Sequence, residues 1–549
     1  MHGNPNQATA TRYFAGAEQD ALERQLTPET RAWRQARVAL ARKGLAELAK
    51  FDRARMTHDE RVSAELMQWQ LSHLIEGEAY GDYRFPLDQF NGPNVSLVNT
   101  LTVTHPMVTP SDARNYVARL GQVRTRMDEA IAEAERLAAK RMIPPRFILR
   151  STLAQMEHFI GTAAAQNPLV SIFSERMAGI GGLAPDEREA LRATAERIVA
   201  AEVYPAWKRA IALLESIVPA SNDDAGLWRY PGGAKAYAYD LRRFTTTTLS
   251  PDEIHNLGLR EVARIEAEME KVLRGLGRTQ GTLEERGSAL QRALAYPNTE
   301  EGRTAIMADI ERIMRDAGKR SVALFAETPK APVVARPYPR FREAAAAASY
   351  TFPAPDGSRP GTFQIPLRPS QMSRFGLRTL VYHETVPGHH FQVGLEMENT
   401  ALPRFRQLRA YGFISAYGEG WALYAERLAA ESGWYDGDPE GLLGQLAAEL
   451  FRARRLVVDT GLHAKRWTRE QAIAYGIGPS EVERYVVFAG QACSYKIGQL
   501  KILELRDRAR RAFGERYSPK DFHRVVLGTG SVPLELLERE VDAYIARTK

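Results

Sequence analysis

The sequence predicts a mostly α-helical protein with a short β-hairpin or small sheet. Apolar residues recur at helical spacing through most of the 549 residues. Three Ser/Thr-x-x-Glu/Gln patterns, which start helices by satisfying free backbone amides, begin at Thr57, Ser250 and Thr468. Only two short extended runs stand out in the second half, at residues 349–353 and 362–367.

In the first half, helices are predicted within residues 17–80, 111–165 and 185–217. Residues 85–110 differ from their neighbours. Residues 91–94 (NGPN) are typical of a turn, and a β-branched stretch follows them. We therefore expect a loop with one short strand in this segment.

Two loops suggest how the chain divides. Residues 228–233 (WRYPGG) and the proline-rich segment 329–339 interrupt the helical pattern. We expect an N-terminal helical region at 1–230, a helical connector at 231–340 and a catalytic region at 341–549. The three could form one intertwined, two-lobed unit.

The two extended runs are separated by a turn-rich loop, residues 356–361 (DGSRPG). This arrangement predicts a β-hairpin just ahead of the histidine-rich motif described below. A free strand edge there could align a peptide by main-chain hydrogen bonds. A simple surface hairpin is the alternative.

Composition excludes several functional classes. Hydrophobic residues make up 44% and charged residues 26%, as in ordinary globular proteins. The net charge of +7 comes from basic residues scattered among acidic ones, so no nucleic-acid partner is expected. No apolar run reaches 18 residues, so no integral membrane segment is expected. The single cysteine, Cys493, excludes an internal disulfide.

The compartment and the oligomeric state stay open. Residues 1–7 lack a basic-then-apolar export signal. We expect a periplasmic protein if such a signal was removed, and a cytoplasmic one otherwise.

Residues 380–392 (LVYHETVPGHHFQ) hold three of the eleven histidines. A zinc hydrolase needs neutral imidazoles to hold the ion and a carboxylate to take a proton from water. His383 and Glu384 begin as in the helical His-Glu-x-x-His motif, but Pro387 occupies the position of the second histidine. The motif is therefore a variant zinc site, with Glu384 as the expected base.

The second histidine ligand has two candidates. On an unbroken helix, His390 would lie about 10 Å along the axis from His383, too far to share an ion. Pro387 disfavours helix and Gly388 tolerates almost any backbone angle, so a local break could bring either histidine back. We favour His389, with His390 as the alternative.

A third ligand is expected further along the chain. Glu419 lies between two glycines at the start of a predicted helix, where small neighbours allow close packing. Glu426 lies two turns later and could instead form a surface ion pair. We favour Glu419.

Three more residues are candidates for supporting roles. Asp459 and His463 share one helical face and could orient a ligating histidine, or form a satisfied core pair. Tyr495, among small residues, could stabilise the oxyanion of a tetrahedral intermediate, or simply pack.

Several separated motifs give the chain a resemblance to a large bacterial family catalogued as domain of unknown function 885. Weaker similarity extends it over nearly the whole chain. The matching stretches are DGSRPGTF (356–363), HETVPGHH (383–390), YGEGWALYAE (417–426), RRLVVDTGLH (454–463) and GQACSYKIG (490–498).

The resemblance implies a gluzincin-type zinc metallopeptidase with an active-site channel between helical lobes. It implies Zn²⁺ ligands at His383, at His389 or His390, and at Glu419, with Glu384 as base. As a hypothesis, Zn²⁺ and Glu384 activate a water that attacks a peptide bond.

In that hypothesis, Tyr495 and the non-ligating His390 steady the oxyanion. A helix-lined channel would favour short or unfolded peptides. The alternatives are a zinc hydrolase of a non-peptide amide or ester, and an inactive helical binding protein.

Overall fold

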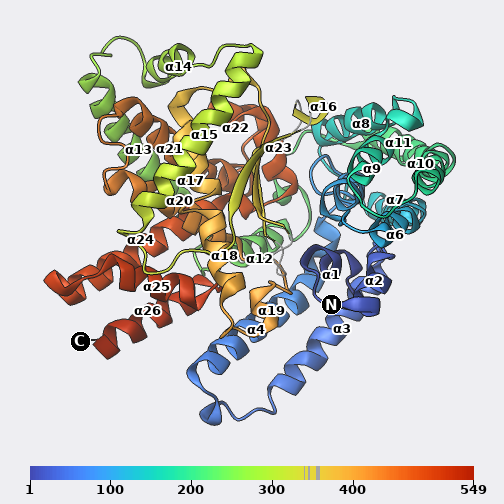
Figure 1. Ribbon diagram of the computed structural model, residues 1–549, viewed down its shortest axis with the longest axis horizontal. Coiled ribbons are helices and arrows are strands. Elements are labelled where there is room, and N and C mark those ends of the chain that lie inside the picture. The colour runs from blue at the N-terminus through green and yellow to red at the C-terminus, as the bar shows by residue number, and fades with distance from the viewer. Residues whose placement is uncertain (339, 344–346, 354–358, 549) are drawn as a thin grey trace.

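The computed structural model describes residues 1–338, 340–343, 347–353 and 359–548. The described chain is helical apart from one small sheet, which confirms the predicted fold class (Figure 1). The helices of the first half are α1 (Pro5–Thr11), α2 (Gly16–Glu23), α3 (Arg31–Leu48), α4 (His58–Glu76), α5 (Pro93–Asn99), α6 (Pro110–Leu120), α7 (Val123–Ala139), α8 (Arg146–Ile160), α9 (Pro168–Ala178), α10 (Pro185–Ile198), α11 (Tyr204–Ile217), α12 (Gly233–Thr245) and α13 (Pro251–Gly275).

The second half contains the sheet and the remaining helices. Its strands are β1 (Val333–Pro337), β2 (Ser349–Thr351) and β3 (Gly361–Ile365). Its helices are α14 (Leu283–Ala293), α15 (Glu300–Ser321), α16 (Arg340–Glu343), α17 (Arg374–Glu384), α18 (His389–Glu398), α19 (Arg404–Gln407), α20 (Ser415–Glu431), α21 (Pro439–Ala464), α22 (Arg469–Ala474), α23 (Pro479–Val487), α24 (Ser494–Phe513), α25 (Pro519–Thr529) and α26 (Leu534–Thr548).

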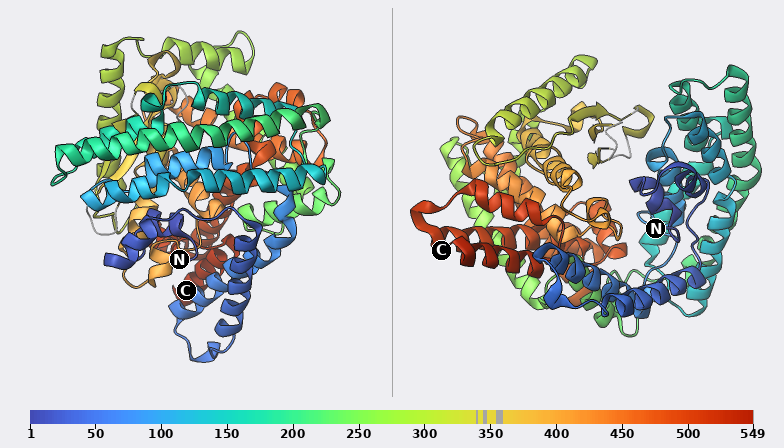
Figure 2. Two further views of the ribbon diagram at one scale, coloured as in Figure 1. Left: turned by 90° about the vertical axis from the view of Figure 1, so that its right-hand side faces the viewer. Right: turned by 60° about the horizontal axis from the view of Figure 1, so that its bottom comes forward.

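Helices α6 to α11 form a lobe of their own, coloured cyan to green (Figures 1 and 2). Its apolar core lies within residues 26–217 and includes the fully buried Trp207. A second apolar core contains Leu66 of α4, Trp421 of α20 and Ile502 of α24. The predicted division at residues 230 and 340 stays a prediction.

The short strand expected at residues 85–110 is wrong, whereas residues 85–92 and 105–109 form the expected loop. Pro93 begins α5, and a π-helix, Thr100–Thr104, continues it. Leu97 and Leu101, four residues apart, are 1% and 0% exposed in the core of the lobe. Burial of this helical face outweighs the weak strand preference of the β-branched residues around it.

The sheet has the order β1-β3-β2. Strands β2 and β3 pair antiparallel, which confirms the predicted hairpin, and residues 354–358 of its loop lie outside the described residues. Strand β1 pairs parallel with β3 and was not predicted, because its segment, residues 329–339, was interpreted as a proline-rich connector. The sheet therefore has two edges, β1 and β2.

Helix α20 packs against α17, α18 and α24 (Figure 1). It packs closely on α24 because two glycines meet. A Cβ atom added to Gly420 would lie 2.5 Å from the Cα atom of Gly498. Only residues without side chains allow this backbone separation.

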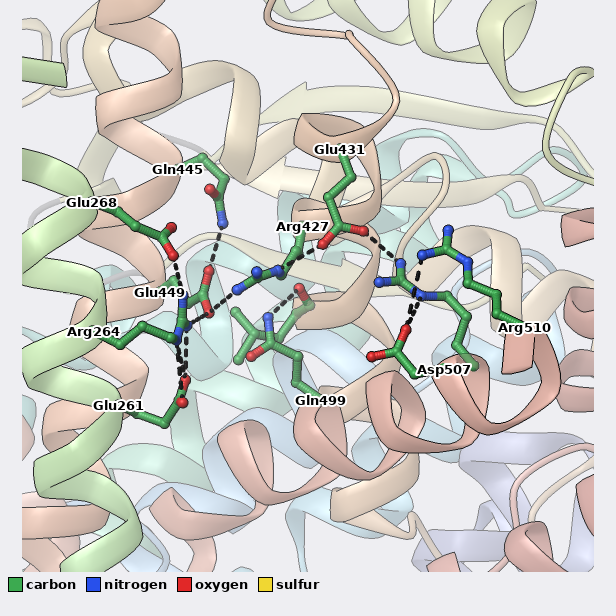
Figure 3. Close-up of polar contacts among 12 residues, drawn as sticks. Glu261, Arg264, Glu268, Arg427, Glu431, Gln445, Glu449, Gln499, Asp507 and Arg510 are labelled. Atoms are coloured by element: carbon green, nitrogen blue, oxygen red, sulfur yellow. Dashed lines mark hydrogen bonds and ion pairs between the residues drawn. The ribbon is translucent and has the colours of Figure 1, made fainter. Parts of the chain in front are cut away.

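Buried charges also join α20 to its neighbours (Figure 3). Glu449 of α21 accepts hydrogen bonds from Arg264 of α13 at 2.7 Å and from Arg427 of α20 at 3.2 Å. The buried Lys496 of α24 donates another at 2.6 Å. Although burial raises the pKa of Glu449, these cations lower it to about 2. The network fixes α20, because loss of one partner would leave a buried charge unpaired.

Candidate metal centre

A break between two helices brings the motif histidines together. Helix α17 ends at Glu384 and α18 begins at His389, so the chain is not helical at residues 385–388. Gly388 fits here because it has no side chain: a Cβ atom would lie 2.0 Å from the His383 carbonyl oxygen. Trp421 of α20 donates a hydrogen bond to the Pro387 carbonyl at 2.9 Å. The expected interruption at Pro387 and Gly388 is confirmed.

Three side chains from three helices converge at this break. The Oε2 atom of Glu419 lies 3.6 Å from Nε2 of His383 and 3.4 Å from Nε2 of His389. One ligand atom from each residue lies within 4.8 Å of the other two. The two imidazole rings are nearly perpendicular, with centroids 4.7 Å apart.

The donor set fits a zinc ion. Tetrahedral zinc with bonds of about 2.0–2.1 Å needs ligand atoms about 3.3–3.4 Å apart. The two measured separations to Glu419 are close to this value, and two imidazoles with one carboxylate are a common zinc donor set.

The electrostatics of the cluster also favour a cation. Burial raises the pKa of Glu419, but the charge of His389 and the hydrogen bonds from both histidines hold it well below its usual range. Burial lowers the pKa of His383, but hydrogen bonds to Glu419 and Glu426 raise it to about 9. Positive charge between these groups, either a proton or a metal ion, is therefore stabilised.

Glu426 makes a contact that the sequence did not reveal. Its side chain is fully buried, and Oε1 lies 2.7 Å from Nδ1 of His383. The alternative of a surface ion pair is therefore wrong. Because Nδ1 donates to this carboxylate, Nε2 of His383 is left to face Glu419. The signal was its spacing: Glu426 lies seven residues after Glu419, on the same helical face.

His390, the alternative ligand, points elsewhere. Its Nε2 atom lies 3.0 Å from the Ala331 carbonyl oxygen, and Nδ1 lies 2.9 Å from the Tyr350 hydroxyl. A carbonyl can only accept, so Nε2 carries the proton and Nδ1 accepts from Tyr350. Burial lowers the pKa of His390 to about 4, which keeps the ring neutral.

Glu384, the expected base, follows His383 directly and is 8% exposed. No hydrogen bond or ion pair to its carboxylate occurs among the residues that the structure describes. The carboxylate of Glu384 therefore has no structural partner among the described residues.

Tyr495 lies at the start of α24, one turn before Gly498, where α24 crosses α20 beside Glu419. The guanidinium of Arg455 stacks on its ring at 4.4 Å. The tyrosine is thus near the helix crossing, and its role stays a prediction.

Comparison with known proteins identifies the family. Residues 5–541 match the family described as "Bacterial protein of unknown function (DUF885)". The chain belongs to the DUF885 family. No curated protein matches it.

Solved structures from other bacteria resemble this chain. "The putative lipoprotein from Colwellia psychrerythraea" is 32% identical, with a TM-score of 0.92 over 99% of this chain and 96% of its own. "A putative lipoprotein of unknown function from Shewanella oneidensis" is 18% identical, with a TM-score of 0.70 over 98% and 96%. "A putative oligoendopeptidase F from Bacillus anthracis" is 14% identical, with a TM-score of 0.36 over 94% of each chain.

The motifs that suggested DUF885 separate in space into two groups. HETVPGHH and YGEGWALYAE together supply the three residues of the metal cluster. In RRLVVDTGLH, His463 accepts a hydrogen bond from the Leu227 amide at 3.0 Å and donates to the Tyr485 carbonyl at 3.0 Å. Asp459 accepts from the Tyr237 hydroxyl at 2.7 Å. Asp459 and His463 thus each have partners within the core, and among the described residues no hydrogen bond joins either of them to His383 or His389.

In DGSRPGTF, residues 356–358 lie outside the described residues, and 361–363 belong to β3. No helix within the described ranges is both long and apolar enough to cross a membrane.

Proposed function

We propose that this protein is a zinc-dependent metallopeptidase of the gluzincin type, acting on short or unfolded peptides. The proposal depends mainly on one observation: His383, His389 and Glu419, from three helices, offer ligand atoms within 4.8 Å of one another. Glu384 adjoins the first of them on the same helix.

The chemistry divides between metal and protein. When bound, a zinc ion supplies a Lewis acid that polarises a peptide carbonyl and makes a water molecule acidic. Glu384, buried and without a structural partner among the described residues, accepts the proton of that water and returns it to the leaving amine. Glu426 holds the His383 ring in one orientation.

Tyr495 remains the candidate donor to the developing oxyanion, since it lies at the crossing of α24 and α20. His390 is less suited to that role, because both of its ring nitrogens already have partners. We propose instead that it fixes Tyr350 and β2 beside the metal centre.

Two measurements test the proposal together. Metal analysis of untagged protein should find about one zinc per chain. A digest of a peptide library, read by mass spectrometry, should show cleavage that chelation abolishes and zinc restores. A metal-free native protein would favour the alternative of a helical binding protein, whereas zinc without peptide cleavage would favour a non-peptide amide or ester substrate.

The cellular location is part of this proposal. The similar structures are described as lipoproteins, which suggests an exported protein for this chain as well. Fractionation of the source cells, with periplasmic and cytoplasmic marker enzymes as references, tests it.

A further inference from the structure

A pocket of about 440 Å³ lies between the N-terminal segments and the sheet. One wall comes from residues 9–12 and 103–108, and the other from residues 350–353, α18 and the end of α19. In the right-hand view of Figure 2 the dark-blue N-terminal helices face the olive strands. We call it the arginine pocket, after its residues Arg12, Arg176, Arg359 and Arg409.

The charged side chains that line this pocket are all positive among the described residues. Four arginines line it, and none of its described lining residues is acidic. Apolar side chains form much of the remainder, among them Met397 and the exposed Val108. Such a surface attracts a negatively charged group attached to an otherwise apolar chain.

Two of these arginines, Arg176 and Arg12, have no carboxylate oxygen within 3.5 Å among the described residues. Arg409 is firmly paired with the buried Glu396 at 2.5 Å. Arg176, in contrast, donates to neutral backbone carbonyls, those of Thr102 at 3.0 Å and His105 at 2.6 Å. No carboxylate pairs with Arg176 among the described residues. Its charge is therefore available to a ligand.

Arg12, on the wall formed by residues 9–12 and 103–108, has only distant carboxylate partners. Its guanidinium lies 3.6 Å from Asp112 and 3.8 Å from Glu23, longer than direct hydrogen bonds. The side chain of Arg12 is 31% exposed. Arg12 can thus bind a further carboxylate without breaking a close pair.

The pocket adjoins the metal centre. Val393 and Met397, which line it, follow His389 on α18 by one and two turns. The helix rise places them about 6 and 12 Å along the axis from that ligand. Tyr350 on the sheet side of the pocket is hydrogen-bonded to His390 at 2.9 Å. An extended peptide covers about 3.3 Å per residue, so about two to four residues separate the metal from the pocket.

We propose that the arginine pocket binds a carboxylate of the peptide substrate, about two to four residues from the bond that is cleaved. The inference rests on the proposed function, because it concerns the same substrate. The carboxylate can be the C-terminus of the peptide or an aspartate or glutamate side chain. The chemistry at the pocket is the same, and the experiment separates the two sources.

The first experiment measures binding rather than turnover. Four fluorescent hexapeptides are built on one apolar sequence. The first has a free C-terminus and the second an amidated one. The third is amidated and carries one glutamate, and the fourth is amidated and carries glutamine at the same position. Their dissociation constants for Glu384→Gln protein are measured by anisotropy. We expect a carboxylate to tighten binding about tenfold, with the preference decreasing as salt is raised.

Variants locate the effect. Arg12→Gln and Arg176→Gln should each reduce the preference for the carboxylate peptides, and the double variant should bind all four peptides about equally. Both side chains are at least partly exposed, so the fold should persist, as a thermal unfolding curve checks. Arg315→Gln is the matched control, since Arg315 is 68% exposed on α15 and does not line the pocket.

The outcomes are distinct. Tighter binding of the free acid alone assigns the C-terminus, and tighter binding of the glutamate peptide alone assigns a side chain. Equal affinities for all four peptides, or no binding, overturn the inference. A preference that survives in the double variant overturns the assignment to this pocket. A carboxylate preference without cleavage of any of these peptides by zinc-loaded wild-type protein contradicts the proposed function and leaves the pocket assigned.

Discussion

The Nδ1 atom of His383 lies 2.7 Å from Oε1 of Glu426, and both side chains are buried. Glu426 lies two turns after Glu419 on α20, so one helix supplies a carboxylate to each nitrogen of the same ring. When an ion replaces one proton of the ring, Nδ1 keeps its proton for Glu426 and Nε2 is left to coordinate the ion.

Replacement of Glu426 should weaken metal binding without removing a ligand. We expect Glu426→Ala to lower zinc affinity about 10- to 100-fold, because His383 loses its orienting acceptor. Glu426→Gln should lose less zinc affinity, since its amide oxygen can still accept a hydrogen bond from Nδ1 of His383. Competition with a chromophoric chelator measures the affinities. Glu470→Gln on α22, where the side chain is 75% exposed, should match the wild type.

Metal content should distinguish the adjacent histidines. His389→Ala and Glu419→Ala each remove a ligand, so zinc per chain should fall from about one to near zero after dialysis. His390→Asn should keep the metal, because the native ring contacts Ala331 and Tyr350 instead. Elemental analysis decides. Retention in the His389 variant with loss in the His390 variant would reverse the ligand assignment.

Glu384→Gln should separate metal binding from chemistry. Glutamine has nearly the same shape but cannot accept a proton, so kcat should fall at least about 100-fold with zinc content unchanged. Turnover of a cleaved library peptide, measured beside zinc content, checks this. An unchanged rate would remove Glu384 from the mechanism.

The close crossing of α20 and α24 should tolerate no added methyl group. In Gly498→Ala the new Cβ atom would lie 1.9 Å from the Ala416 carbonyl oxygen, so we expect a loss of about 2–3 kcal/mol of unfolding free energy. Gly287→Ala is the control: its Cβ atom meets no atom within 4 Å inside α14, and alanine favours helix. Urea unfolding compares the two. Equal stabilities would show that the crossing can relax.

Acid should destabilise the core through His463. Burial lowers the pKa of His463 to about 3, below the value of about 6.5 expected when unfolded. The neutral ring therefore contributes its full stability above about pH 6.5 and loses it as the pH falls toward 3. His463→Gln keeps a donor and an acceptor but cannot titrate. Unfolding is measured in the presence of a chelator, so that metal binding does not contribute. Between about pH 6 and pH 4 the unfolding free energy of the wild type should fall more steeply than that of the variant, with slopes that differ by about 1.4 kcal/mol per pH unit. Parallel pH profiles would contradict this.

The helices were predicted well, because helix caps and helical spacing depend on residues that are close in sequence. The capping boxes at Thr57, Ser250 and Thr468 all form in the structure. The strand expected after residue 94 did not form, because strand preference depends on the surroundings, and the core of the lobe selected a helix. Strand β1 was missed for a related reason: its partner, β3, is distant in sequence.

For the site, the sequence by itself determined the chemistry: the residue types, the break at Pro387-Gly388 and a glutamate between glycines were readable from the chain. Only the tertiary structure decided the geometry. It turned His390 toward Ala331, placed Glu426 on His383 and kept Asp459 with His463 in the core. The reason is physical: the position of a side chain depends on how helices pack, and packing is the sum of many contacts between residues far apart in sequence.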